Sequence, residues 1–153
     1  MRRYLSVYVL AVGLMALPMA GEAMSFGSNA PESTAGPTYE EGRELALSGN
    51  FRMAIDKLQM VLDAEPKNAD AWNMLGFSYR NEGKMDEAWD AYERALALDP
   101  NHKGAHEYLG EWYLMLGDLA SAKAQQAKLE ALCPSGCIEL ETLAKKVADA
   151  TNS

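Results

Sequence analysis

The sequence has few of the residues from which catalytic and metal sites are built. Its 153 residues include two cysteines, Cys133 and Cys137, and two histidines, His102 and His106. It contains no G-x-S-x-G, no phosphate-binding glycine loop, no H-E-x-x-H and no C-x-x-C-H. Nucleophilic, nucleotide, zinc and haem sites are usually recognised by these motifs. We therefore expect no enzymatic activity, no catalytic residue, no cofactor and no metal site.

Basic residues are also scarce. The chain has 14 Lys and Arg against 22 Asp and Glu, a formal net charge of −8. Its lysines and arginines form no stripe or cluster, whereas binding a phosphate backbone requires clustered positive charge. This excludes nucleic acid as an expected partner.

Long hydrophobic runs are limited to one, at the N-terminus. Two arginines precede an apolar stretch from Tyr4 to Leu17, and small residues follow up to Ala23. The stretch is shorter than the roughly 20 residues needed to span a bilayer, and the layout is typical of a secretory signal peptide. We expect residues 1–23 to be a signal, cleaved after Ala23 or alternatively after Ala20, leaving no stable membrane insertion. The protein would then be periplasmic or secreted.

Residues 24–37 are rich in Ser, Gly, Ala and Pro and have no helical period. Such composition favours a disordered leader.

The most regular stretch runs from Ala69 to His102. Its first half repeats apolar and small residues at the helical spacing i, i+3, i+4 and i+7, namely Trp72, Leu75, Gly76 and Tyr79. Its second half does the same with Ala88, Tyr92 and Ala95. Gly83 separates the two halves, and Pro100 ends the second. The pattern predicts an antiparallel helical hairpin with an apolar seam.

These residues resemble the signature of the tetratricopeptide repeat, W-x-x-L-G-x-x-Y followed by Ala, an aromatic and Pro over 34 residues. The same interval relates further columns: Gly42, Gly76 and Gly110; Gly49, Gly83 and Gly117; Ala54, Ala88 and Ala122; Pro66, Pro100 and Pro134. Thr38 and His106 stand where the middle copy has Trp72, and such departures are expected in terminal repeats. We expect three repeats within residues 38–134, at about 35–68, 69–102 and 103–136.

The resemblance implies an all-α solenoid of helical hairpins. The expected helices cover residues 38–48, 51–64, 69–81, 85–98, 103–115 and 119–132. A seventh, near 138–150, has Leu140, Leu143, Ala144 and Val147 on one face, and we expect it to cap the third repeat, with residues 135–153 forming this helix and a tail. Met53, Met60, Met74, Met85 and Trp89 lie at helical positions where packing in the core or between repeats is expected.

Cys133 and Cys137 lie four residues apart, between the last repeat helix and the capping helix. In an exported protein, a pair so close predicts a structural disulfide. The alternative is a redox or metal-handling pair, although the spacing is not C-x-x-C and zinc needs about four ligands. His102 and His106 make a weak metal site for the same reason, and His106 fills the column of Trp72.

The resemblance also implies that the first helix of each pair lines a concave groove that binds a partner segment. By column, the lining residues are Tyr39, Arg43, Asn73, Phe77, Arg80, Asn81, Glu107 and Glu111, followed by Leu114 and Met115. We expect Phe77 to be exposed as an apolar contact, Arg80 to bind a carboxylate, and Asn73 and Asn81 to bond an extended backbone. Glu107 and Glu111 indicate a partner with basic character. The Lys and Asn clamp of chaperone-tail binders is not matched.

The function indicated is a protein-protein interaction adaptor that binds a protein or peptide partner. Two alternatives stay open. One is a thiol redox or metal-handling protein that uses Cys133 and Cys137, and the other is a scaffold that self-assembles through its repeat faces.

Overall fold

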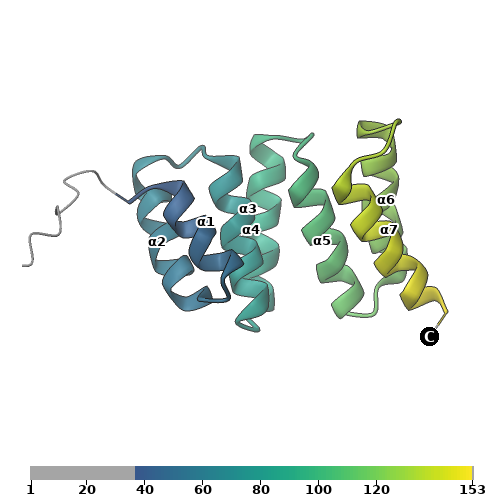
Figure 1. The fold of residues 1–153 in the computed structure, drawn as a ribbon, viewed down its shortest axis with the longest axis horizontal. Coiled ribbons are helices and arrows are strands. Elements are labelled where there is room, and N and C mark those ends of the chain that lie inside the picture. Colours follow the sequence, from purple (N-terminus) through teal and green to yellow (C-terminus); the bar gives the residue numbers. More distant parts are fainter. Residues whose placement is uncertain (1–36, 153) are drawn as a thin grey trace, which may run out of the picture. The chain divides into compact units, whose positions relative to one another are not determined.

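The computed structural model describes residues 37–152, so the expected signal peptide and residues 24–36 of the leader lie outside the described part. All regular structure within residues 37–152 is helical: α1 (Tyr39–Leu47), α2 (Phe51–Ala64), α3 (Ala69–Asn81), α4 (Met85–Leu98), α5 (Lys103–Met115), α6 (Leu119–Leu132) and α7 (Ile138–Thr151). Figure 1 shows them following one another as hairpins in chain order. The all-α solenoid is confirmed, and no helix end differs from expectation by more than one residue.

The first helix of each repeat begins where a side chain accepts one of the free backbone N–H groups. Thr38 and Glu41 form a reciprocal capping box at the start of α1. Asn68 Oδ1 accepts from Ala71 N at 2.9 Å to begin α3. His102 has the same place in the next repeat, and its Nδ1 accepts from Ala105 N at 3.0 Å. The other ring nitrogen of His102 lies 3.0 Å from Asp70 Oδ1, so both nitrogens of this ring contact protein groups.

The turn inside each hairpin requires glycine. Gly83 has a φ of +77°, in the left-handed region that side chains disfavour, and Gly49 and Gly117 at the equivalent positions have +82° and +77°. This is why glycine recurs at the 34-residue interval.

A second glycine column lies where the helices of a hairpin cross. A Cβ atom placed on Gly76 would lie 2.6 Å from the ring of Tyr92, which is fully buried. In the first repeat Gly42 meets Leu58, which stands in the column of Tyr92. The third repeat has the polar Gln126 in that column, and the side chain that packs against Gly110 is instead Leu143 of α7. The capping helix therefore supplies the apolar contact that the third repeat lacks.

The helix α7 packs on both α5 and α6, with Leu143 and Val147 buried. This confirms its expected position as a cap. No helix among the described residues is long and apolar enough to cross a membrane.

The expected burial of the methionines is only partly right. Met74 is buried, but Met53 and Met60 on α2 are 60% and 52% exposed, and Trp89 on α4 is 39% exposed. One side of α2 and of α4 packs into the stack of hairpins, while the opposite side faces solvent because no further layer of helices among residues 37–152 covers it.

We predict that Gly76→Ala destabilises the protein. At an unhindered helix position this change would stabilise by roughly 0.5–1 kcal/mol. Here the new methyl group would displace the buried ring of Tyr92, and overpacking of this kind costs about 1–3 kcal/mol. Urea unfolding measures the difference. Gly104→Ala is the control, since its Cβ would meet the amide end of Asn73 at 3.0 Å and the His102 ring at 3.4 Å, neither closer than 3.0 Å. A stabilised Gly76→Ala protein would contradict the close packing.

Candidate functional site

One groove of about 760 Å³ gathers most of the residues expected to bind a partner. We call it the α3–α5–α7 groove, after the helices that line it: Phe77, Arg80, Asn81, Glu107, Tyr108, Glu111, Leu114, Met115, Thr142, Lys146, Asp149 and Ala150. Five of the eight expected residues lie in it, together with Leu114 and Met115. Tyr39, Arg43 and Asn73 do not line it. The four residues from α7 were missed, because sequence periodicity does not give the angle at which a capping helix docks.

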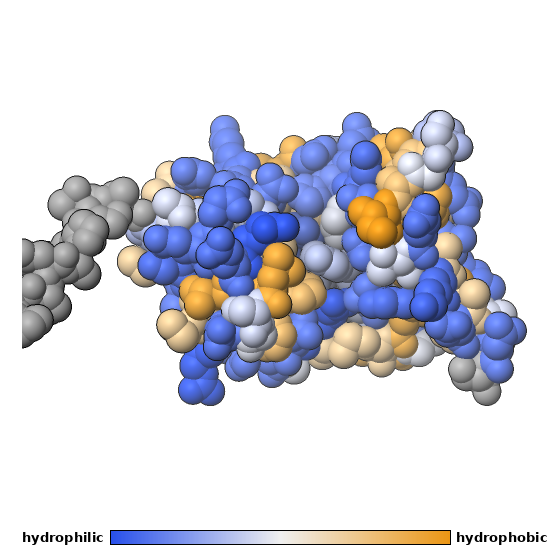
Figure 2. All heavy atoms as spheres, in the orientation of Figure 1, coloured by the Kyte–Doolittle hydropathy of each residue, from blue (hydrophilic) through white to orange (hydrophobic). Residues whose placement is uncertain are grey.

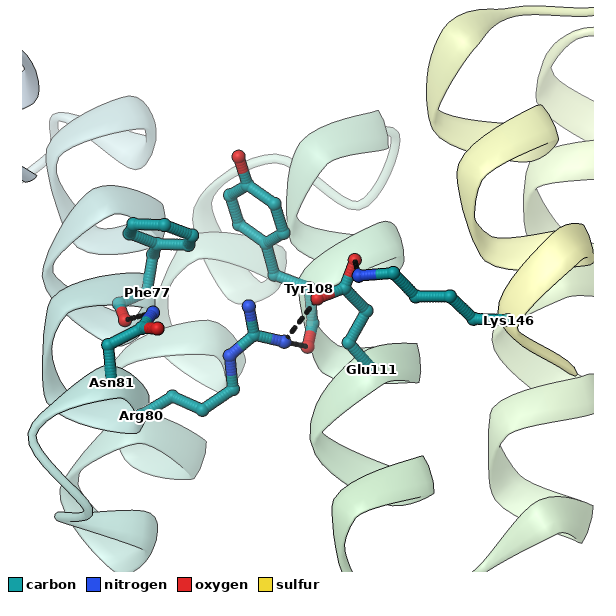
Figure 3. A network of polar contacts seen from close by, with 6 residues as sticks. All are labelled: Phe77, Arg80, Asn81, Tyr108, Glu111 and Lys146. Carbon is teal, nitrogen blue, oxygen red and sulfur yellow. Dashed lines mark hydrogen bonds and ion pairs between the residues drawn. The ribbon is translucent and has the colours of Figure 1, made fainter. Parts of the chain in front are cut away.

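The groove is crossed by a charged network that links three helices (Figure 3). Arg80 on α3 donates from Nη1 to Glu111 Oε2 on α5 at 2.6 Å, and Lys146 on α7 donates to Glu111 Oε1 at 2.5 Å. The same Arg80 nitrogen lies 3.5 Å from the carbonyl oxygen of Tyr108. Arg80 and Glu111 are buried, whereas 47% of the Lys146 side chain is exposed. One carboxylate thus holds α3, α5 and α7 at a fixed spacing.

This network corrects two expectations. Arg80 is not free to bind a partner's carboxylate, because it is buried and already paired with Glu111. Glu111 in turn does not present a free negative charge, because Arg80 and Lys146 both donate to it. The two partners stand 31 residues apart, at positions of successive repeats that face each other. The helical pattern places each residue on a face of its own helix, so it did not predict that Arg80 and Glu111 pair.

Phe77 is half-buried, not exposed as expected. Its ring lies between those of Phe51 and Tyr108, with centroids 6.0 and 5.0 Å away. The Arg80 guanidinium carbon lies 5.6 Å from the ring centroids of both Phe77 and Tyr108. Cation and rings therefore stabilise one another inside the groove.

Glu107 lies one turn before Glu111 on α5, and its pKa is raised far above the usual value of a glutamate. Burial raises its pKa to about 7, and the nearby carboxylates of Glu111 and Glu139 add to the shift, while Lys146 and Arg80 oppose it. A half-buried carboxyl group at the groove wall thus changes its charge close to neutral pH.

The remaining expected residues differ in how accessible they are. Asn73 is 5% exposed, and its Oδ1 is buried without a hydrogen-bond partner, so the expectation that it bonds a partner's backbone is wrong. Asn81 is exposed and donates from Nδ2 to the carbonyl oxygen of Phe77 at 2.7 Å. Arg43 is exposed, and Tyr39 is half-buried with its pKa raised to about 12, mainly by burial.

The structure joins Cys133 and Cys137 by a disulfide, with Cα atoms 5.9 Å apart, in the usual range. Cys133 is buried and Cys137 is the residue from which α7 begins. The pair therefore lies at the junction that sets the direction of the capping helix. That the protein carries this bond in the cell stays a prediction.

His106 takes the structural place of Trp72, as its column indicated. Trp72 Nε1 donates to the carbonyl oxygen of Pro66 at 3.0 Å, and His106 Nε2 lies 3.0 Å from the carbonyl oxygen of Pro100, one repeat later. The other nitrogen of His106 lies 2.8 Å from Gln125 Oε1. Within residues 37–152, no three His, Cys, Asp or Glu side chains come together as metal ligands would.

Hydrophobic side chains are dispersed on the face drawn in Figure 2, where small apolar patches are separated by hydrophilic residues. In the α3–α5–α7 groove, the exposed apolar contribution comes mainly from Met115, which is 61% exposed.

We predict that Glu111→Ala destabilises the protein by about 3–5 kcal/mol, since it leaves the buried charge of Arg80 unpaired. Lys146→Ala should cost less than about 1 kcal/mol, because that lysine is half exposed. The free energy of unfolding in urea distinguishes the two. Equal costs would show that the buried pair does not carry the charge network.

We also predict a pH dependence of stability from Glu107. Because its pKa is raised from 4.5 to about 7 on folding, the native chain binds more protons than the unfolded chain between these values. The free energy of unfolding should therefore fall as pH rises through this window. Glu107→Gln lacks this contribution, so its advantage over the unchanged protein should grow from about pH 4.5 to 7 and then level off. A difference that does not vary with pH would contradict the raised pKa.

Comparison with known proteins identifies the repeats. The family model of the tetratricopeptide repeat matches residues 69–102, the most regular stretch of the sequence. A probable UDP-N-acetylglucosamine–peptide N-acetylglucosaminyltransferase SPINDLY of Hordeum vulgare is 37% identical over 71 residues, which cover 46% of this chain. The matched region is 7% of that relative's length, so the similarity concerns the repeats and not the whole enzyme.

Two solved structures with bound peptides share the fold. The first tetratricopeptide domain of Spaghetti, bound to an HSP90 peptide, has a TM-score of 0.65 at 24% identity and covers 75% of this chain and 90% of that one. The Yersinia enterocolitica type III secretion chaperone SycD, in complex with a peptide of the translocator YopD, has a TM-score of 0.63 at 19% identity, covering 74% and 86%. Residues 69–102 are therefore a tetratricopeptide repeat, and the 34-residue columns, helical hairpins and glycine crossings of residues 37–152 give the described part of the chain the tetratricopeptide fold.

Proposed function

We propose that this protein is an interaction scaffold that binds an extended segment of a partner protein in the α3–α5–α7 groove. The observation that carries the proposal is the network of Arg80, Glu111 and Lys146, which fixes three helices around an open groove of about 760 Å³. A groove whose walls are held rigid loses little freedom when a segment binds. The peptides bound by the two related folds support the same kind of partner.

The partner segment is proposed to be mainly apolar, with one basic side chain. The lining contains two basic residues, Arg80 and Lys146, and three acidic ones, Glu107, Glu111 and Asp149. Because Glu111 is bonded by both basic residues, the expected basic character of the partner rests chiefly on Glu107. Apolar side chains of the segment would contact Leu114 and Met115.

We also propose that the protein is exported to the periplasm or secreted and works there without catalysing a reaction. The signal-like pattern of residues 1–23 supports export, and the joined pair of Cys133 and Cys137 is compatible with an oxidising compartment. Burial of Cys133 restricts thiol attack on this disulfide to the half-buried sulfur of Cys137.

Crosslinked affinity capture from the protein's own cells tests this function. We expect Asn81→Lys with Met115→Lys to lose the main captured partner, because both residues are exposed in the groove and the lysines would obstruct an apolar segment. The matched control is Met53→Lys with Met60→Lys, which adds the same charges at exposed positions of α2. Equal capture by both variants would contradict a partner in this groove.

Two further measurements in the same experiment address the cysteines and the location. The mass of the captured protein shows whether residues 1–23 are absent and whether Cys133 and Cys137 have lost two hydrogens. A Cys133→Ser, Cys137→Ser variant should retain the partner. Loss of a mixed-disulfide partner in this variant alone would favour the redox alternative.

A further inference from the structure

A second groove, of about 870 Å³, lies between the second helices of the first two repeats. We call it the α2–α4 groove, and it shares no residue with the α3–α5–α7 groove. Its lining is Gln59, Leu62, Asp63, Trp72, Leu75, Tyr79, Glu87, Asp90, Ala91, Glu93, Arg94 and Ala97. Among the described helices, α2 and α4 do not pack directly against each other, while α3 packs against both. The helix α3 therefore forms the floor of this groove.

The floor carries two aromatic rings whose polar atoms are already bonded. Trp72 Nε1 donates to the carbonyl oxygen of Pro66 at 3.0 Å, and the Tyr79 hydroxyl accepts from Gln59 Nε2 at 2.7 Å. Their ring faces attract cations of the chain itself. The Arg94 guanidinium carbon lies 5.7 Å from the Trp72 ring centroid, and Lys84 Nζ lies 5.6 Å from that of Tyr79. Half-buried aromatic rings at the bottom of a groove are thus in positions that cations occupy.

The rim of the groove is strongly acidic. Asp63 lies on α2, and α4 contributes three carboxylates, Glu87, Asp90 and Glu93, against the single cation Arg94. All four carboxylates are exposed. The lining therefore has four acidic residues and one basic residue, an excess much larger than in the α3–α5–α7 groove.

The repeat fold does not require these acids. One repeat later, at the interval of 34, the chain has Ala97, Ser121, Ala124 and Ala127 in the columns of Asp63, Glu87, Asp90 and Glu93. The third repeat forms the same hairpin with these neutral residues. In that repeat His106 replaces Trp72, and its ring is bonded to Gln125 on α6. Of the middle and third repeats, only the middle one therefore combines open aromatic rings with an acidic rim.

We propose that the α2–α4 groove binds an extended, arginine-containing segment of a second protein. One guanidinium would stack on Trp72 in place of Arg94, and others would bond the rim carboxylates through paired N–H donors. A second copy of this chain is a poor occupant, because the chain has a net charge of −8. With two separate grooves of different chemistry, the scaffold would hold two partners at once.

A labelled synthetic peptide made of four Arg-Ala pairs tests this proposal. Its binding to the purified protein is measured by fluorescence anisotropy. The decisive variant is Glu87→Ser, Asp90→Ala and Glu93→Ala, which gives α4 the residues that α6 already has. We expect binding to weaken about ten-fold, as losing three exposed charge pairs implies. A Lys peptide of the same length should bind several-fold more weakly than the Arg peptide, because an ammonium cannot stack as a planar guanidinium does.

Two control variants distinguish binding in the α2–α4 groove from non-specific attraction to acidic residues and from binding in the α3–α5–α7 groove. Glu40→Ala with Glu82→Ala and Glu141→Ala removes three exposed acids elsewhere and should change affinity less than two-fold. Asn81→Lys with Met115→Lys should also leave most of the affinity. The proposal is overturned if the peptide does not bind, if the charge control loses as much affinity as the groove variant, or if only the Asn81→Lys, Met115→Lys protein loses it. A concentration-dependent dimer in sedimentation that the groove variant abolishes would assign the surface to a second copy and also overturn it.

Discussion

In each repeat a large side chain from a neighbouring helix rests directly on a glycine. Leu58 lies on Gly42, Tyr92 on Gly76 and Leu143 on Gly110. Without a Cβ atom at these glycines the two backbones can approach, and the side chain that fills the space becomes fully buried. The same contact explains the capping helix. Because Gln126 cannot fill the apolar space over Gly110, α7 provides Leu143 and covers the exposed side of the third repeat.

Docking of α7 also creates the candidate binding site. Lys146 reaches Glu111 only because α7 lies against α5, and four residues of α7 complete the groove wall. The buried pair of Arg80 and Glu111 is weak evidence for stability by itself, since removing two charges from water is costly. Its more evident effect is geometric, because a carboxylate shared by two cations fixes the positions of three helices. A groove bounded in this way is suited to binding a segment without first changing shape.

Charge is distributed differently over the two surfaces of the repeats. In the α3–α5–α7 groove the charges neutralise one another across helices, leaving Glu107 with a pKa near neutrality. In the α2–α4 groove the lining has four acids and Arg94 as its one basic residue, so most of the negative charge on its rim has no counterpart in the lining. From Glu107 and Glu111 we expected a basic partner in the α3–α5–α7 groove. The excess of acidic residues in the α2–α4 groove is a stronger reason to expect a basic partner there.

The helices, their order and the repeat could be predicted from the sequence, because those features depend on local chemistry. The capping residues Thr38, Asn68 and His102, the turn glycines and the helical period act over a few residues, and they recur every 34. Seven residues of the α3–α5–α7 groove could also be identified through their columns. The tertiary structure was needed to show that Arg80 pairs with Glu111, that Asn73 is buried and that Met53 and Met60 face solvent. These outcomes depend on which side chains from separate helices meet, and a periodic pattern gives the face of a helix but not its neighbour.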